Sequence, residues 1–247
     1  MEKFEIRQEK VIGYMTELSK RLLTIASFVQ QGSRIADIGT DHGYLPIYLM
    51  EQGIAVSGLA MDIRKGPLDR AKEHIREAGL EEKIETRLSN GLEKLNPGEA
   101  DTVIIAGMGG PLILDILRAG TLVFSEINEF VLSPQADWRG FRLGMRELGL
   151  IIRREEMVFE DGKYYLIVRA VHGNAADEAA DELSVRFGQL LLKEKNPVLK
   201  SYLIWQEEIL TGILHKLTEG SRLEVSRRKA EVESDLSYVR SAIETFM

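Results

Sequence analysis

The pattern of apolar and polar positions divides most of the chain into strand-length and helix-length segments. Short apolar runs bounded by glycine, proline or polar residues are typical of buried strands, and they occupy residues 34–38, 55–61, 84–88, 101–106 and 129–132. Helical spacing of apolar residues predicts helices at 16–30, from Pro46 onward, and at 66–78, 112–119 and 137–148. Two further strands, 150–159 and 164–171, flank the turn 160–163 as a hairpin. Alternating strands and helices closed by an antiparallel hairpin predict a doubly wound, Rossmann-like α/β sheet.

The pattern changes after Gly173, where no convincing strand follows. Asn196-Pro197 is a helix N-cap followed by a proline at the first helical position. Apolar residues then repeat at intervals of seven on both sides of Gly220-Ser221, which predicts two helices packed as an antiparallel coiled-coil hairpin. We therefore expect a sheet domain in residues 1–172 and an all-helical accessory domain in residues 173–247. Residues 1–15 carry little periodicity and are read as an extension.

Composition excludes several chemistries. The chain of 247 residues contains no cysteine, which rules out disulfides, cysteine-ligated metals and cysteine nucleophiles. Its four histidines are scattered without metal-ligand spacing, so no metal is expected. No segment is long and apolar enough to cross a membrane, and no signal peptide is recognisable, so a cytoplasmic protein without a membrane partner is expected. The sequence does not decide the oligomeric state; a monomer is the expectation.

The turn after the first strand carries the first candidate site. It reads Asp37-x-Gly39-x-Asp41-x-Gly43, with Pro46 near the start of the following helix. The dinucleotide fingerprint would place a glycine where Asp41 stands. The pattern instead resembles the first motif of S-adenosylmethionine methyltransferases, whose cofactor has an ammonium group and no phosphate. The alternative is an ordinary strand–helix turn with spare glycines.

Two later stretches extend this site. Asp62 follows the second strand and lies 19 positions beyond Gly43, close to the spacing at which a carboxylate meets ribose hydroxyls. The alternative for Asp62 is a helix-capping acid. Three of the four residues Gly107–Gly110 are glycines, which is explained better by a floor where two substrates approach the backbone than by packing.

The whole pattern resembles one family, the bacterial tRNA adenine-22 N1-methyltransferases that use S-adenosyl-L-methionine. The motifs that carry the resemblance span about residues 18–217 and are Leu18-Ser-Lys-Arg-Leu22, Ala36-Asp-Ile-Gly-Thr-Asp-His-Gly-Tyr-Leu-Pro46, Asp62 with Gly66-Pro67, Asn90-Gly-Leu92, Ala106-Gly-Met-Gly-Gly110, Asp161-Gly-Lys-Tyr-Tyr165 and Leu191-Leu-Lys-Glu-Lys-Asn-Pro-Val198. One departure is Ser133-Pro134-Gln135, where the family commonly has Gln-Pro-Asn.

The resemblance implies roles for particular residues. The residues implied to bind S-adenosyl-L-methionine are Asp37, Gly39, Thr40, Gly43, Asp62, Ile63, Asn90, Gly91, Ala106, Gly107, Met108 and Gly109. The catalytic candidates are Asp41, to stabilise positive charge on the methylated base, and His42 or Gln135, to bind the base edge; for Asp41 and His42 the alternative is capping of the next helix.

The implied partner, tRNA, has to be held by local basic clusters because the net charge of the chain is −7. The candidates for phosphate contacts are Arg21, Lys193, Lys195, Lys200, Arg222, Arg227, Arg228 and Lys229, the last four read as lying near the base of the helical hairpin. Because Glu224 and Glu231 interleave with them, a solvated, salt-bridged helix face is the alternative for each.

Methylation of adenine N1 requires no strong base, since N1 already offers a lone pair, and catalysis then rests on positioning and electrostatics. The chain lacks the Asn/Asp-Pro-Pro-Tyr segment of exocyclic-amine methyltransferases, which favours a ring nitrogen over N6. Two alternatives stay open: a methyltransferase acting on another RNA or on a small molecule, and a non-catalytic module that binds S-adenosyl-L-methionine or RNA.

Overall fold

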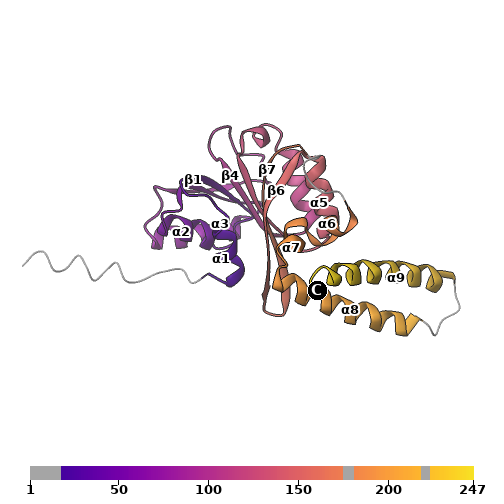
Figure 1. The fold of residues 1–247 in the computed structure, drawn as a ribbon. Helices are drawn as coiled ribbons and strands as arrows, with labels where there is room; N and C mark the ends of the chain where they lie inside the picture. Colours follow the sequence, from indigo (N-terminus) through magenta and orange to yellow (C-terminus); the bar gives the residue numbers. More distant parts are fainter. Residues whose placement is uncertain (1–17, 175–180, 218–222) are drawn as a thin grey trace, which may run out of the picture. The chain divides into compact units, whose positions relative to one another are not determined.

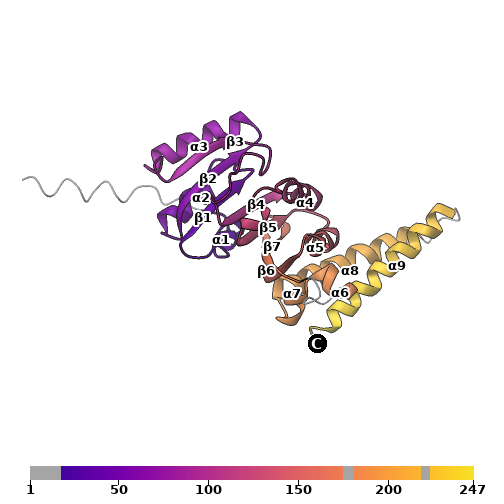
Figure 2. The same cartoon turned by 90° about the horizontal axis from the view of Figure 1, so that it is seen from above.

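The computed structural model describes residues 18–174, 181–217 and 223–247 (Figures 1 and 2). Its sheet has the strand order β3-β2-β1-β4-β5-β7-β6. The pairs β1–β2, β1–β4 and β2–β3 are parallel, and β6–β7 is antiparallel. The strands are β1 Ser33–Ile38, β2 Ala55–Asp62, β3 Ile84–Leu88, β4 Thr102–Met108, β5 Glu129–Pro134, β6 Leu150–Glu160 and β7 Lys163–His172. The predicted α/β class, a parallel sheet closed by an antiparallel hairpin, is confirmed.

Helices follow most strands, and only helices are described after β7. They are α1 Lys20–Ala26, α2 Tyr44–Glu51, α3 Lys65–Glu77, α4 Gly110–Ala119, α5 Trp138–Glu147, α6 Glu182–Phe187, α7 Gln189–Lys193, α8 Pro197–Leu217 and α9 Leu223–Glu244, with a 3-10 turn, η1, at Phe124–Glu126. Within the part of the chain that the structure describes, no helix combines the length and apolar character needed to cross a membrane.

The chain forms two compact units. The first comprises the residues up to Ala106 together with Asp115–Leu132, and the second comprises Gly107–Leu114 and Ser133–Met247. The expected domain boundary at residues 172/173 falls inside the second unit and stays a prediction.

In the first unit the apolar runs form buried parallel strands. Ile35, Ala36 and Ile38 of β1 are almost completely buried, as are Ile104 and Ile105 of β4. Strands buried on both faces need continuous apolar sequence, which is why these runs were recognisable.

The first predicted helix ends at another residue than expected. The first helix begins at Lys20 after the N-cap Ser19 and stops at Ala26 instead of reaching residue 30. Beyond it, Phe28 and Val29 bond back three residues in tight turns, and both side chains are buried, so core packing replaces the helical continuation. The proposed start of this helix at residue 16 and the extension 1–15 lie outside the described residues.

In the second unit, β6 and β7 join through a two-residue turn, Asp161–Gly162. Both turn residues have left-handed φ angles, 49° and 74°, as a type I′ hairpin turn requires. The register pairs Glu160 with Lys163 at the end of the ladder. The predicted hairpin is therefore confirmed, with each strand slightly longer than expected.

Helices α8 and α9 lie side by side as the predicted helical hairpin (Figures 1 and 2). The Asn196 side chain caps α8, because its Oδ1 accepts hydrogen bonds from Val198 N and Leu199 N, both at 3.0 Å. The seam between the helices buries Leu199 and Leu203 of α8, and Val232, Leu236 and Val239 of α9. The predicted break at Gly220-Ser221 lies outside the described residues.

Candidate functional site

Two buried carboxylates stand at the carboxyl ends of neighbouring parallel strands in the first unit. Asp37 in β1 is 7% exposed, and Asp62, the last residue of β2, is 5% exposed. The register pairs Asp37 with Ala60 and Ile38 with Met61, so both acids belong to the same edge of the sheet. A buried carboxylate is costly unless a cation or donors meet it. Arg64 meets Asp62, with its Nε 3.6 Å from Oδ1, whereas no ion pair with a described residue reaches Asp37, which points to a ligand there.

Burial raises the pKa of Asp37 from 3.8 to about 6; the Thr40 side chain partly offsets this rise, and the charge of Asp62 adds to it. The Thr40 hydroxyl is itself buried, and its oxygen meets no partner in hydrogen-bond geometry. An unsatisfied hydroxyl beside a destabilised carboxylate indicates a place where a polar ligand completes the hydrogen bonding.

The turn after β1 is held by its backbone. The N–H groups of Gly39 and Thr40 both donate to the carbonyl of Met61, at 2.8 and 2.9 Å. Gly43 has φ 69°, and a Cβ built on it would lie 3.2 Å from the Cβ of Ala71 in α3. Close packing of α3 therefore accounts for Gly43, while its contact with a cofactor stays a prediction.

Asp62 has one oxygen engaged and one available. Its Oδ1 accepts the N–H of Arg64 at 2.7 Å, which holds the turn leading into α3. No hydrogen bond from a described residue reaches its other oxygen. The next side chain, Ile63, is 62% exposed, and its contact with a cofactor stays a prediction.

Ser89 shapes the turn after β3, a structural role to which the sequence analysis did not assign it. Its hydroxyl donates to the carbonyl of Gly91 at 2.9 Å and accepts the N–H of Lys94 at 3.2 Å, which fixes the turn after β3. Asn90 donates to Glu93 at 2.6 Å, and a Cβ on Gly91 would lie 2.9 Å from Ile116 Cγ2. The sequence signal that could have indicated this turn is a serine at the end of a strand, directly before Asn-Gly.

In the second unit, the glycine-rich stretch lies against the end of β5. The N–H of Gln135 donates to the carbonyl of Met108 at 2.9 Å, which brings a predicted catalytic residue to a predicted cofactor residue. Gly107 has φ 81°, and open space surrounds the missing Cβ of Gly109.

The prediction that these glycines do not serve packing is wrong for Gly110. A Cβ at Gly110 would lie 3.0 Å both from the carbonyl oxygen of Ala136 and from Phe141 Cβ. In addition, β4 continues to Met108 and α4 starts at Gly110, so only Gly109 connects the two elements. Packing thus accounts for Gly110, while the floor at Gly107–Gly110 stays a prediction.

Comparison with known proteins places these features in a family. Residues 18–168 match the family model described as a methyltransferase domain. The tRNA (adenine(22)-N(1))-methyltransferase of Bacillus subtilis is 34% identical over 225 residues, which cover 89% of this chain and 93% of the relative. The chain belongs to the tRNA (adenine(22)-N(1))-methyltransferase family.

Solved structures agree with this assignment. A Streptococcus pneumoniae protein in complex with S-adenosyl-L-methionine has a TM-score of 0.82 and 31% identity, covering 92% of this chain and all of its own. M. capricolum TrmK in complex with S-adenosyl-homocysteine has a TM-score of 0.81 and 30% identity, with coverage of 94% and 100%.

In this methyltransferase the motif residues Asp41 and His42 do not cap α2. The N-cap position is Gly43, and no side chain bonds to the helix start. Asp41 is exposed and accepts a hydrogen bond from Arg70 Nη2 at 3.1 Å. The His42 ring stacks on Tyr44 and on His74, at centroid distances of 5.2 and 5.5 Å. Their catalytic role stays a prediction.

The basic residues predicted to bind tRNA divide into two groups. Arg227 and Arg228 pair with Glu231 at 3.4 and 3.1 Å, and Lys229 lies 3.8 Å from Glu233, so these cations form a salt-bridged helix face. They lie in the first part of α9, at the opposite end of the hairpin from the start of α8, which corrects the expectation that they lie near its base.

The second group lies at the junction of α7 and α8. Lys193, Lys195 and Lys200 are exposed there, and none forms an ion pair with another described residue. Arg21 lies in α1, and Arg222 lies outside the residues whose side chains are described. Phosphate contacts by any of these residues stay a prediction.

Proposed function

We propose that this protein transfers the methyl group of S-adenosyl-L-methionine to N1 of adenine 22 in tRNA. Family membership supports the reaction. The main evidence for the cofactor site is the pair of buried carboxylates, Asp37 and Asp62, together with the Thr40 hydroxyl, which has no hydrogen-bond partner. When bound, S-adenosyl-L-methionine supplies an electrophilic methyl group on a sulfonium, together with an ammonium and ribose hydroxyls that suit this donor and acceptor set.

Each residue of the first unit then has a separate task. Ionised Asp37 holds the ammonium group, and the Thr40 hydroxyl donates to the same end of the ligand. The available oxygen of Asp62 accepts from a ribose hydroxyl, and the exposed face of Ile63 covers the adenine. The remaining residues of this unit proposed to border the cofactor are Gly39, Gly43, Asn90, Gly91 and Ala106, and those of the second unit are Gly107, Met108 and Gly109.

The second unit contributes the base-binding groups. Adenine N1 carries its own lone pair, so the protein has to position the base and tolerate the cation that forms. Gln135 is exposed at the end of β5, with its backbone fixed to Met108, and its amide is proposed to bond the base edge. Asp41 is proposed to stabilise the cationic product, and its pairing with Arg70 weakens that contribution.

The proposal is tested with unmodified tRNA transcripts and methyl-labelled S-adenosyl-L-methionine. A transcript with adenine at position 22 should accept label as 1-methyladenosine, and a matched transcript with guanine there should accept none. Equal labelling of both would move the reaction to another position. Cofactor binding without transfer to any tRNA would instead support a non-catalytic module or a different acceptor.

A further inference from the structure

The second unit contains a cavity of about 690 Å³, and Gln135 is the one lining residue to which a role has been given so far. Residues from five separate parts of the chain line it: the β5–α5 segment, the β6–β7 turn, α6, α8 and α9. The lining residues on which the argument rests are Gln135, Trp138, Lys163, Tyr164, Tyr202 and Trp205. One end of the cavity therefore reaches the residue proposed to bind the target base.

Aromatic rings form one wall of the cavity. Tyr202 lies at the centre, with ring centroids 5.1 Å from Trp138, 5.2 Å from Tyr164 and 5.9 Å from Trp205. The Trp138 indole is fixed, because its Nε1 donates to the carbonyl of Pro134 at 3.0 Å. These centroid separations lie in the range of favourable aromatic pairs, so the rings support one another before any ligand arrives.

Unlike the rings of a hydrophobic core, this aromatic wall is partly exposed to solvent. Trp205 is 43% exposed although it has a large indole ring. A half-exposed tryptophan held by neighbouring rings offers a flat apolar face to a ligand. Burying that face would contribute to binding, whereas its exposure contributes nothing to folding.

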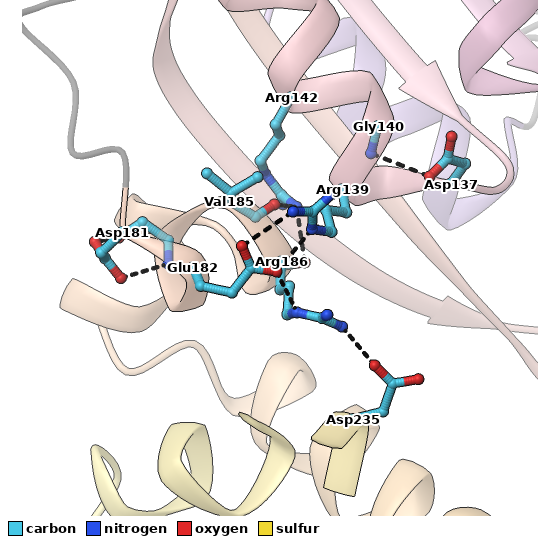
Figure 3. Close-up of polar contacts among 10 residues, drawn as sticks. Asp137, Arg139, Gly140, Arg142, Asp181, Glu182, Val185, Arg186 and Asp235 are labelled. Atoms are coloured by element: carbon cyan, nitrogen blue, oxygen red, sulfur yellow. Dashed lines mark hydrogen bonds and ion pairs between the residues drawn. The ribbon is translucent and has the colours of Figure 1, made fainter. Parts of the chain in front are cut away.

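Ion pairs tie the surrounding helices together (Figure 3). Glu182 of α6 accepts from Arg139 of α5 at 2.7 Å and from Arg186 at 2.6 Å, and Arg186 donates onward to Asp235 of α9 at 2.9 Å. Arg139, Arg186 and Asp235 all line the cavity. The chain of pairs thus links α5, α6 and α9 around a preformed space.

Lys163 supplies positive charge at the cavity. It lies at the first position of β7, and it forms no ion pair with another described residue. Unlike the two arginines, it is therefore available to a negatively charged ligand. A flat aromatic face with an available cation matches a base and its phosphate, which is the chemistry of single-stranded nucleic acid.

We propose that this cavity binds an unstacked nucleobase of the tRNA, with its ring on the face of Trp205 and its phosphate beside Lys163. The inference rests on the proposed function, because it takes tRNA as the substrate. Methylation of a base within a folded tRNA requires local unstacking, and a stacking surface compensates for the interactions that the base loses.

Substitutions at Trp205 test the proposal through tRNA affinity. Loss of one stacked base corresponds to a roughly 5- to 150-fold weaker Kd, so Trp205→Ala should fall in that range. Trp205→Leu keeps an apolar side chain and should lose as much, whereas Trp205→Phe should stay within about threefold of wild type. The Kd for S-adenosyl-L-methionine should not change in any of them, and Trp205→Phe, which keeps a ring in the cluster, should also keep the melting temperature.

A neighbouring residue provides the matched control. Ile204 is 44% exposed on the same helix and does not line the cavity. Ile204→Ala should therefore leave tRNA affinity unchanged. Lys163→Gln should lower the slope of log Kd against log salt by about one, while the Trp205 variants should leave that slope unaltered.

The outcomes separate the two proposals. Wild-type protein that forms no 1-methyladenosine would refute the proposed function. Wild-type protein that methylates tRNA, together with a Trp205→Ala variant that binds tRNA normally, would overturn the cavity assignment alone. A Trp205→Leu variant that binds tRNA as tightly as wild type would also overturn the cavity assignment. An apolar side chain without an aromatic ring would then be sufficient at this position.

Discussion

Asp37→Asn should stabilise the free protein and weaken its binding of S-adenosyl-L-methionine. Burial raises the pKa of Asp37 from 3.8 to about 6, so the folded state binds this proton more tightly than the unfolded state does. The wild type therefore loses stability as pH rises from about 4 to about 6 and does not regain it above that range. A pKa difference of about two corresponds to roughly 3 kcal/mol at neutral pH.

Asparagine has nearly the same shape and carries no charge, so the variant avoids this cost. Urea unfolding of the free proteins at pH 4.5 and pH 7.5 measures the effect. The variant should be more stable by about 1 kcal/mol at the lower pH and by up to about 3 kcal/mol at the higher pH. Calorimetry at pH 7 should show a cofactor Kd roughly 10- to 100-fold weaker, because a hydrogen bond to a charged group is lost.

The wild type should also bind the cofactor progressively more weakly as pH falls below 6, whereas the variant should show no such dependence between pH 5 and 7. A variant that is less stable than wild type at pH 7.5 would refute the electrostatic argument. Unchanged cofactor affinity would instead remove Asp37 from the ammonium site while leaving its burial cost intact.

Three other substitutions test the proposed ribose contact, the proposed catalytic carboxylate and a buried ion pair. Asp62→Ala should weaken cofactor binding in calorimetry, because it removes the carboxylate oxygen proposed for the ribose; unaltered affinity would contradict that role. Asp41→Ala should lower the turnover of tRNA methylation by less than about tenfold, since the exposed carboxylate already pairs with Arg70; comparable losses in turnover and cofactor affinity would refute the division of roles. Arg142→Met should cost about 3–5 kcal/mol in urea unfolding, because it strands buried Glu155, which Arg142 Nε meets at 2.9 Å. Adding Glu155→Leu should recover much of that loss; no recovery would argue against stranded charge as the cause.

The parallel strands and their polar ends were readable in the sequence because each signal is local. Burial on both faces requires continuous apolar runs, and the residue that follows each run lies at the ligand edge of the sheet. Spacing alone therefore indicated a nucleotide-like site at Asp37 and Asp62, whereas their separate roles came from the family resemblance. The Asn196 cap and the turn at residues 160–163 are equally local signals, and both were recognised.

The features that escaped prediction depend on side chains far apart in the chain. The aromatic cluster joins Trp138 to Tyr164 and Trp205, which no periodicity relates. The buried pair Arg142–Glu155 combines a helix residue with a strand residue, and each looks like an ordinary surface charge in sequence. Gly110 looked like part of a ligand floor because its constraint comes from Phe141, thirty-one positions later.

The charge distribution of the second unit bears on how tRNA can be held. A net charge of −7 gives the whole protein no general attraction for phosphate. At the cavity, Arg139 and Arg186 already form ion pairs with carboxylates. Among the cations named as lining the cavity, Lys163 is therefore the one available to a phosphate. Few available cations mean few released counterions, so a larger share of the affinity has to come from stacking on uncharged rings. The half-exposed Trp205 is the residue on which that share would chiefly rest.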